Sequence, residues 1–352
     1  MIIESSTKEY MVNIEKDFKF VETLKKEENT LFVIDSNVYD LYYSILFQDI
    51  QKENLYIIEA IETNKTIESV LAICEVMTKI PAKRNAHLVS FGGGIVQDIT
   101  GFVANILYRG ISWTFVSTTL LASCDSCIGG KTSLNYKQYK NLLGTFYPPD
   151  QIYICSQFFY TLSDNDFKSG LGEIFKFNIM YGEQGIIKIE NNIEQLLARN
   201  KETLDEFVEQ SLIFKKGFIE EDEFDKGIRI HLNFAHTFGH AIEAVSNYMI
   251  PHGTAVAIGA LVANRISFER GLLNEDIVTR METIIKKIIN VDMLQTSFDL
   301  DKIVDAIRKD KKQINNNLTA VLFYGNMQLK VYHNLQKEEI KQAINFVSKI
   351  LK

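Results

Sequence analysis

The sequence predicts two domains, an α/β domain with a parallel, doubly wound sheet and a mainly α-helical domain after it. Up to residue 163, strand-like apolar runs alternate with helix-like segments. From residue 164 onward, amphipathic helical patterns dominate. At 352 residues the chain is also long for one domain. We therefore expect an α/β domain over residues 1–163 and a helical domain over residues 164–352.

The expected strands of the first domain are apolar runs that end at polar residues or glycines. They cover residues 31–34, 54–58, 87–91 and 111–116. Segment 67–80 lies between the second and third runs and has the apolar spacing of a helix. Because strands that are apolar throughout are typical of a sheet covered on both faces, the sheet is expected to be parallel.

The second domain is expected to contain amphipathic helices and one late hairpin. The clearest helical patterns cover residues 191–214, 230–248 and 253–271. The hairpin pairs residues 318–324 with 327–332, and Gly325-Asn326 forms its turn.

Composition limits the possible partners and locations. The chain is 46% hydrophobic and 24% charged, as is usual for a soluble globular protein. A net charge of −7 gives no basic surface for nucleic acid. The N-terminus lacks the pattern of a signal peptide, and the longest apolar segment, 254–263, is too short to span a membrane. We expect a cytoplasmic, metabolic protein that binds neither nucleic acid nor a membrane.

One short region carries a pattern typical of metal ligands. His236 and His240 are four residues apart on an expected helix, so both imidazoles project from one face. Arg229 and Asn233 precede them at intervals of about one turn, which predicts a column of four polar side chains. His252 begins another apolar helix. Imidazoles from neighbouring helices, completed by a carboxylate, suit a divalent transition metal, although an ordinary pair of histidines would read the same way.

Glu173 is the candidate carboxylate for this site. It lies three residues before Lys176 on one face of an expected helix, in an apolar setting that disfavours a solvated ion pair. Lys215 and Lys312 add cations from separate segments.

Three glycines, Gly92-Gly93-Gly94, stand where a strand ends and a helix begins. Backbone amides in such a turn can approach a phosphate, and the helix N-terminus adds favourable partial charge. Asp98 follows on the helix, and Glu62 and Lys65 follow the second strand, where they could meet a ribose. The pattern predicts nucleotide binding, whereas a simple tight turn with surface polar residues would read the same way.

Further cations lie beside glycines in the first domain. Arg109, Lys131 and Lys140 are expected on loops, where they suit a phosphorylated or carboxylated substrate, or else are solvated. Cys124 and Cys127 match C-x-x-C, but no second pair completes a zinc site, so they are interpreted as small buried residues.

Taken together and in order, these motifs resemble those of the 3-dehydroquinate synthases, within the sugar-phosphate cyclase family. The resemblance runs from about residue 35 to residue 312. Its motifs are Gly92-Gly-Gly with Asp98, Tyr-Arg109-Gly, Thr118-Thr119-Leu-Leu-Ala, Asp125 with Gly-Gly-Lys131-Thr, Lys140-Asn141, Glu173-x-x-Lys176, Asn233-Phe-x-His236-Thr-x-Gly-His240-Ala-Ile-Glu and His252-Gly.

The resemblance implies a Rossmann-like NAD-binding domain, a helical metal- and substrate-binding domain, and a homodimer. It implies that Glu173, His236 and His252 bind zinc or cobalt. The substrate would be 3-deoxy-D-arabino-heptulosonate 7-phosphate, contacted by Arg109, Asp125, Lys131, Lys140, Asn141, Lys176, Lys215, Arg229, Asn233, His240 and Lys312. NAD would contact Asp35, Glu62, Lys65, Gly93, Gly94, Asp98, Thr118, Thr119, Asp125, Lys131, Lys140 and Thr161.

The implied reaction belongs to the shikimate pathway of aromatic amino acid biosynthesis. It combines transient oxidation by NAD, phosphate elimination, reduction and aldol cyclisation, which makes the enzyme a carbon–oxygen lyase. Arg229 and Asn233 favour a carboxylated substrate over sedoheptulose 7-phosphate or glucose 6-phosphate, whereas an aminated analogue of the same substrate remains open. Two different functions compete with this interpretation, a metal-dependent alcohol or polyol dehydrogenase and an inactive homologue that binds nucleotide or a partner protein.

The sequence departs from the family pattern beside several of these residues. Ser117 replaces a proline, Ala235 a glycine and Thr254 a glutamate, and Gln97 stands where a small residue is usual. None of these changes removes a predicted ligand, so they bear on the rate and the substrate range.

Overall fold

The computed structural model describes residues 1–81, 83–137, 139–289, 299–309 and 318–351. The chain divides into two compact units, residues 1–161 and residues 162–352. In the part of the chain that is described, no helix is both long and apolar enough to cross a membrane.

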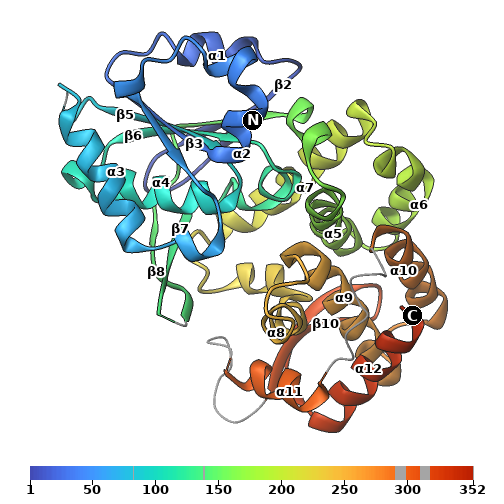
Figure 1. The fold of residues 1–352 in the computed structure, drawn as a ribbon. Coiled ribbons are helices and arrows are strands. Elements are labelled where there is room, and N and C mark those ends of the chain that lie inside the picture. Colours follow the sequence, from blue (N-terminus) through green and yellow to red (C-terminus); the bar gives the residue numbers. More distant parts are fainter. Residues whose placement is uncertain (82, 138, 290–298, 310–317, 352) are drawn as a thin grey trace. The chain divides into compact units, whose positions relative to one another are not determined.

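Unit 1 is built on a seven-stranded sheet with the order β1-β2-β9-β6-β5-β3-β4 (Figure 1). Its strands are β1 (Ile2–Ile3), β2 (Tyr10–Glu15), β3 (Thr30–Asp35), β4 (Leu55–Ile58), β5 (His87–Gly92), β6 (Ser112–Ser117) and β9 (Gln151–Cys155). The β1–β2 pair is antiparallel and the other pairs are parallel. The four predicted strands are thus confirmed as neighbours in a parallel sheet.

Helices accompany this sheet as the alternating pattern predicted. They are α1 (Lys19–Leu24), α2 (Ser36–Tyr42), α3 (Ile67–Lys79) and α4 (Gly94–Ile106). Helix α4 buries Val96, Ile99 and Val103, and the central strands β5 and β6 are buried along almost their whole length. The core of unit 1 therefore lies around β5 and β6, and predicted nucleotide-binding residues directly follow both strands in the sequence.

Two parts of unit 1 were not predicted. Strands β2 and β9 pair with each other and lie between the edge strand β1 and the predicted strand β6. The loops expected to carry Lys131 and Lys140 are instead an antiparallel hairpin, β7 (Lys131–Tyr136) and β8 (Tyr139–Phe146). Both strands of this hairpin mix polar and apolar residues, so they lack the continuous apolar run that marks a buried strand.

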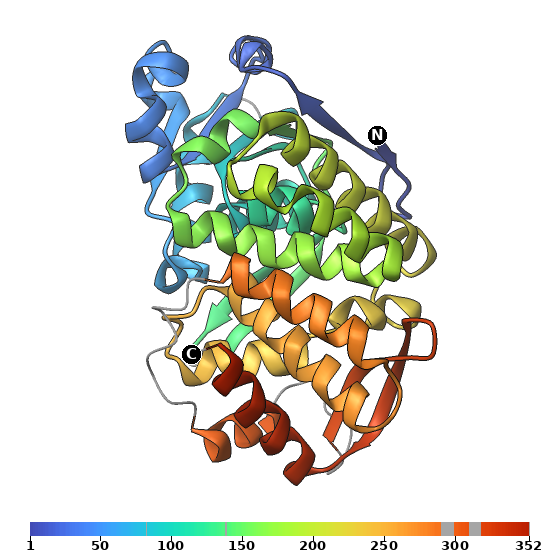
Figure 2. The same cartoon turned by 90° about the vertical axis from the view of Figure 1, so that its right-hand side faces the viewer.

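Unit 2 is mainly helical, with one hairpin (Figures 1 and 2). Its elements are α5 (Asp164–Met180), α6 (Glu183–Leu197), α7 (Lys201–Glu221), α8 (His236–Val245), α9 (His252–Glu269), α10 (Glu275–Ile288), α11 (Leu300–Lys309), α12 (Lys337–Ile350), β10 (Leu318–Tyr324) and β11 (Gln328–Leu335). Helix α9 is buried over most of its length and packs against α5, α8, α10 and α12. This central position explains why its sequence is apolar on all sides.

The single helix expected over residues 191–214 is two helices. Helix α6 ends before Arg199, which has a left-handed backbone with φ of 56°. Asn200 then caps α7 by accepting a hydrogen bond from the backbone N–H of Thr203. The apolar spacing continues across this break, so periodicity alone did not reveal it.

His87, at the start of β5, gives unit 1 a measurable dependence on pH. Its Nδ1 lies 2.7 Å from Ser112 Oγ and its Nε2 lies 3.0 Å from Thr114 Oγ1. Burial lowers the pKa of His87 from 6.5 to about 4. As the pH falls, the unfolded chain binds a proton at His87 before the folded chain does. The stabilising effect of the neutral, buried imidazole is therefore complete above pH 6.5 and is lost as the pH falls toward 4.

Between pH 7 and pH 5, this loss should amount to about 2 kcal/mol. Urea denaturation of the protein and of a His87→Gln variant at both pH values measures it. Between these pH values, the free energy of unfolding should fall by about 2 kcal/mol less in the variant than in the unmodified protein. An equal fall in the two proteins would show that His87 is not the source of the pH dependence.

Candidate functional site

One carboxylate in unit 2 faces two imidazoles from different helices. Glu173 lies on α5, whereas His236 and His252 are the first residues of α8 and α9. Glu173 Oε1 is 3.5 Å from His236 Nε2 and 3.4 Å from His252 Nε2. Two imidazoles and a carboxylate that converge in this way are the donor set of catalytic zinc sites, which keep a fourth position open for water or substrate.

Close packing of α5 on α9 brings these ligands together. A Cβ atom at Gly172 would lie 2.1 Å from the carbonyl oxygen of Gly253, and a Cβ atom at Gly253 would lie 1.9 Å from the carbonyl oxygen of Ser169. The Gly253 N–H donates to Ser169 Oγ at 3.0 Å. Since Glu173 and His252 are the immediate neighbours of these glycines, the backbone approach sets the distance between the two ligands.

The third imidazole of the region also lies in this cluster. The His240 ring centroid is 5.2 Å from that of His236 and 5.5 Å from that of His252. Ligating atoms of the three histidines lie within 4.8 Å of one another. Burial alone would lower the pKa of His252. Hydrogen bonds with Glu173 and Glu243 outweigh this effect and raise the pKa to about 10. The two carboxylates therefore favour the protonated form of His252.

Lys176 adds a buried cation to the same helix face as Glu173. Its Nζ lies 2.5 Å from Glu173 Oε2, and the two side chains are 1% and 0% exposed. A buried pair of this kind is costly unless both charges have partners, which is more typical of a functional site than of a stabilising one.

The predicted column of Arg229, Asn233 and the two histidines on one helix is wrong. Residues Ile228–Asn233 form a separate 3-10 helix, and Ala235 then adopts a left-handed backbone with φ of 69° before α8 begins at His236. The chain changes direction at Ala235, so only His236 and His240 share a helix face.

Two further predicted cations of unit 2 are buried. Arg229 is 4% exposed, its guanidinium donates to the carbonyl oxygen of Glu223, and its backbone N–H donates to Asp222 Oδ2 at 3.1 Å. Lys215 lies on α7 and is 7% exposed. Lys312, which was also predicted to contact substrate, lies outside the described residues.

In unit 1, the residues predicted to bind the cofactor follow the carboxyl ends of neighbouring parallel strands. Asp35 ends β3, Gly93 and Gly94 come after β5, and Thr118-Thr119 come after β6. A Cβ atom at Gly93 would lie 2.9 Å from Thr119 Cγ2, so the two loops are in direct contact. Open α/β sheets bind ligands at this edge. Elsewhere in the unit, Thr161 Oγ1 lies 3.0 Å from the Tyr42 hydroxyl.

A polar network connects the predicted residues near the hairpin. Lys65 Nζ pairs with Asp98 and donates to Asn141 Oδ1 at 2.6 Å. Lys140 Nζ is 3.7 Å from Glu62 Oε1. Five of the residues predicted for cofactor or substrate are thus brought together.

Sequence reasoning missed two members of this network. Ser133 donates through both its backbone N–H and its hydroxyl to Asp98, each at 3.0 Å. Asn135 donates from its amide to Glu62 Oε1 at 2.8 Å. Both lie on β7 at alternate positions, so the hairpin pairing would have revealed that they share a face.

Arg109 and Asp125 lie on irregular segments of unit 1. Arg109 ends a 3-10 helix with φ of 65°, between Tyr108 at 51° and Gly110 at 113°. A left-handed backbone at two consecutive residues other than glycine costs about 1 kcal/mol or more for each and is typical of functional loops. Asp125 lies in a π-helix, Ala122–Ser126, another element often found at functional sites.

Two departures from the family pattern acquire partners next to that π-helix. Gln97 donates to the carbonyl oxygen of Ser126 at 2.7 Å and accepts from its hydroxyl at 2.8 Å. Ser117 accepts a hydrogen bond from Ser123 Oγ at 2.8 Å. Gln97 therefore ties the π-helix to α4, and Ser117 ties it to the carboxyl end of β6.

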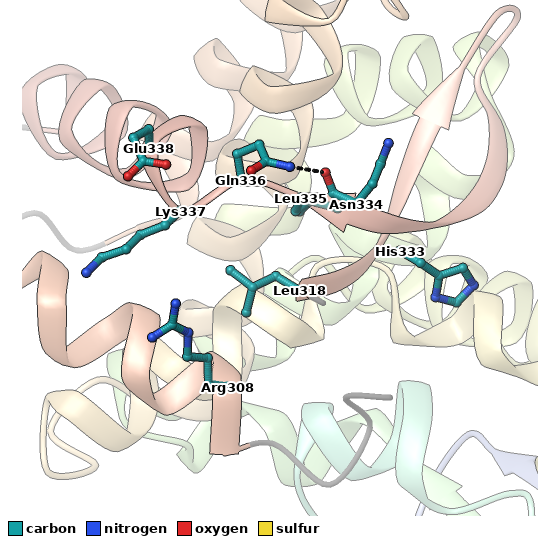
Figure 3. Close-up of a pocket in the computed structure, with 8 residues that line it drawn as sticks. All are labelled: Arg308, Leu318, His333, Asn334, Leu335, Gln336, Lys337 and Glu338. Atoms are coloured by element: carbon teal, nitrogen blue, oxygen red, sulfur yellow. Dashed lines mark hydrogen bonds between the residues drawn. The ribbon is translucent and has the colours of Figure 1, made fainter. Parts of the chain in front are cut away.

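A cavity of about 400 Å³ lies elsewhere in unit 2 (Figure 3). It is lined by Arg308, Leu318, His333, Asn334, Leu335, Gln336, Lys337 and Glu338. In Figure 3 the His333 side chain points away from Arg308 and Lys337, and Lys337 pairs with Asp301 at 3.2 Å. None of the described residues of the predicted site lines this cavity.

The family models described as 3-dehydroquinate synthase N-terminal and C-terminal match residues 55–169 and 170–313. The 3-dehydroquinate synthase of Clostridium tetani is 38% identical over 342 residues, which cover 94% of this chain and 90% of that protein.

Among the solved structures that share the fold are two synthases. One is 2-epi-5-epi-valiolone synthase from Streptomyces hygroscopicus subsp. jinggangensis with NAD⁺ and Zn²⁺ bound, at 22% identity and a TM-score of 0.86, with 97% of each chain covered. The other is 2-deoxy-scyllo-inosose synthase with carbaglucose-6-phosphate, NAD⁺ and Co²⁺, at 24% identity and a TM-score of 0.84, with 98% of each chain covered.

Proposed function

Because the chain belongs to the 3-dehydroquinate synthase family, we propose that it converts 3-deoxy-D-arabino-heptulosonate 7-phosphate into 3-dehydroquinate and phosphate. The family and function predicted from the motifs are confirmed by these relatives. The proposal extends to the reaction class, a carbon–oxygen lyase, and to its dependence on NAD and a divalent metal.

The convergence of Glu173, His236 and His252 carries this proposal. Their donor atoms suit zinc or cobalt, and the fold neighbours were solved with Zn²⁺ or Co²⁺ beside NAD⁺. When bound, the metal would polarise substrate hydroxyls and NAD would take up and return a hydride. We propose that His240, in the same cluster, contacts the substrate and does not bind the metal.

The remaining residues of the site would hold the substrate's charges. Lys176, Lys215 and Arg229 are buried cations, and cationic side chains of this kind bind phosphate and carboxylate groups through charge-assisted hydrogen bonds. Arg229 suits a planar carboxylate in particular, because its guanidinium can donate two parallel hydrogen bonds. This set favours a sugar acid phosphate over a neutral sugar phosphate.

Unit 1 would supply the NAD site and further substrate contacts. Asp35, the glycine turn and Thr118-Thr119 follow the strand ends at which dinucleotides bind in such sheets. Lys131, Lys140 and Asn141 lie on the β7–β8 hairpin, where they would orient the phosphorylated substrate. The homodimer and the cytoplasmic location stay predictions from the sequence.

Phosphate release tests the proposed reaction. Purified protein with NAD and zinc is offered 3-deoxy-D-arabino-heptulosonate 7-phosphate, sedoheptulose 7-phosphate or glucose 6-phosphate, and inorganic phosphate and NADH are measured. We expect release from the first substrate alone, loss of release after chelation, recovery with added zinc, and no accumulation of NADH.

Different outcomes lead to different functions. Release from a neutral sugar phosphate alone would keep the cyclase chemistry and overturn the substrate. NADH that accumulates in proportion to product would indicate a polyol dehydrogenase.

A further inference from the structure

A second carboxylate contacts His252 on the side of the ring away from Glu173. Glu243 lies in the last turn of α8, and its Oε2 is 3.1 Å from His252 Nδ1. The Glu243 side chain is only 14% exposed. His252 is therefore held between two carboxylates, with Glu243 at Nδ1 and Glu173 at Nε2.

This contact fixes which nitrogen of His252 can bind a metal. A carboxylate can only accept a hydrogen bond, so a neutral His252 beside Glu243 carries its proton on Nδ1. The lone pair is then on Nε2, the atom that faces Glu173 Oε1 at 3.4 Å. A carboxylate partner also makes the imidazole a more basic ligand.

His236 is oriented by a different group. Its Nδ1 lies 3.1 Å from the carbonyl oxygen of Phe234, which leaves Nε2 facing Glu173 Oε1 at 3.5 Å. The left-handed backbone of Ala235 turns the chain between these two residues. One imidazole is thus held by the main chain, whereas the other depends on a side chain that can be replaced.

Residue 254, where the family pattern has a glutamate, is not the residue that orients His252. Thr254 lies two residues after His252 on α9, and side chains two apart on a helix point to nearly opposite sides. The carboxylate that reaches His252 comes instead from α8, which packs against α9.

We propose that Glu243 is a positioning residue of the metal site: it holds the His252 ring so that Nε2 points at Glu173, and thereby strengthens metal binding. The inference rests on the proposed metal site of Glu173, His236 and His252. It assigns Glu243 no contact with substrate.

Zinc affinity of the metal-stripped protein tests this role without any assay of turnover. Competition with a chromophoric chelator should give a dissociation constant about 10- to 100-fold weaker in a Glu243→Gln variant. The absorption bands of bound Co²⁺ should also shift, because the His252 ring is no longer held. Glu269→Gln is the matched control, since Glu269 lies at the end of α9 with a 55% exposed side chain; it should bind zinc like the unmodified protein.

A Glu243→Asp variant keeps the charge but shortens the side chain, and its affinity should fall between those of the unmodified protein and the Gln variant. If the Gln variant does not fold, the Asp variant decides: weaker zinc binding supports the inference and unchanged binding overturns it. Unchanged affinity and an unchanged Co²⁺ spectrum in a folded Gln variant would also overturn it. If the unmodified protein itself binds no zinc, the proposed metal site fails, which is a separate result.

Discussion

Replacement of His252 by alanine is expected to abolish tight zinc binding and to slow phosphate release about 1000-fold or more. Polarisation by a metal contributes several kcal/mol to a transition state, and each 1.36 kcal/mol changes the rate tenfold. The substitution removes Nε2, one of the two nitrogens that face Glu173 Oε1. Metal content by elemental analysis and phosphate release from 3-deoxy-D-arabino-heptulosonate 7-phosphate measure the two effects.

His333→Ala is the control for this experiment, because His333 is an exposed residue of β11 whose Nδ1 lies 3.2 Å from Thr319 Oγ1. It should keep both metal and activity. A His252→Ala protein that retained one zinc and its full rate would exclude His252 as a ligand and would move the assignment to the remaining pair, His236 and His240.

Replacement of Gly253 by alanine is expected to lower the free energy of unfolding by about 3 kcal/mol and to weaken zinc binding. The added methyl group would lie 1.9 Å from the backbone carbonyl oxygen of Ser169. A backbone atom inside a packed helix pair cannot move aside as a flexible side chain would, so α5 and α9 must separate. Glu173 and His252 would move apart with them.

Urea denaturation and zinc titration of the variant measure these two losses. Gly217→Ala on α7 is the matched control, because a Cβ atom there meets nothing within 4 Å. This control should gain about 0.5 to 1 kcal/mol, since alanine suits a helix interior better than glycine. Equal stability of Gly253→Ala and the unmodified protein would show that α5 and α9 can separate at little cost.

Much of the fold could be predicted because its signals are local. The four predicted strands are short apolar runs, α3 follows helical spacing, and Gly92-Gly93-Gly94 mark the passage from strand to helix. The sequence also proposed the candidate metal ligands that the structure brings together, because histidines and a glutamate in an apolar setting are rare enough to be conspicuous. The order of the motifs along the chain, which matches that of the family, indicated roles for these residues that their spacing alone does not indicate.

The sequence by itself therefore determined the fold class, the four strands β3 to β6 and the residue types of the candidate site. Only the tertiary structure decided the pairing of β2 with β9, the β7–β8 hairpin that brings Ser133 to Asp98, the turn at Ala235 and the contact of Glu243 with His252. Periodicity and motifs describe neighbours along the chain. These features depend instead on backbone direction and on contacts between segments distant in sequence, and such contacts exist only once the helices and strands have packed.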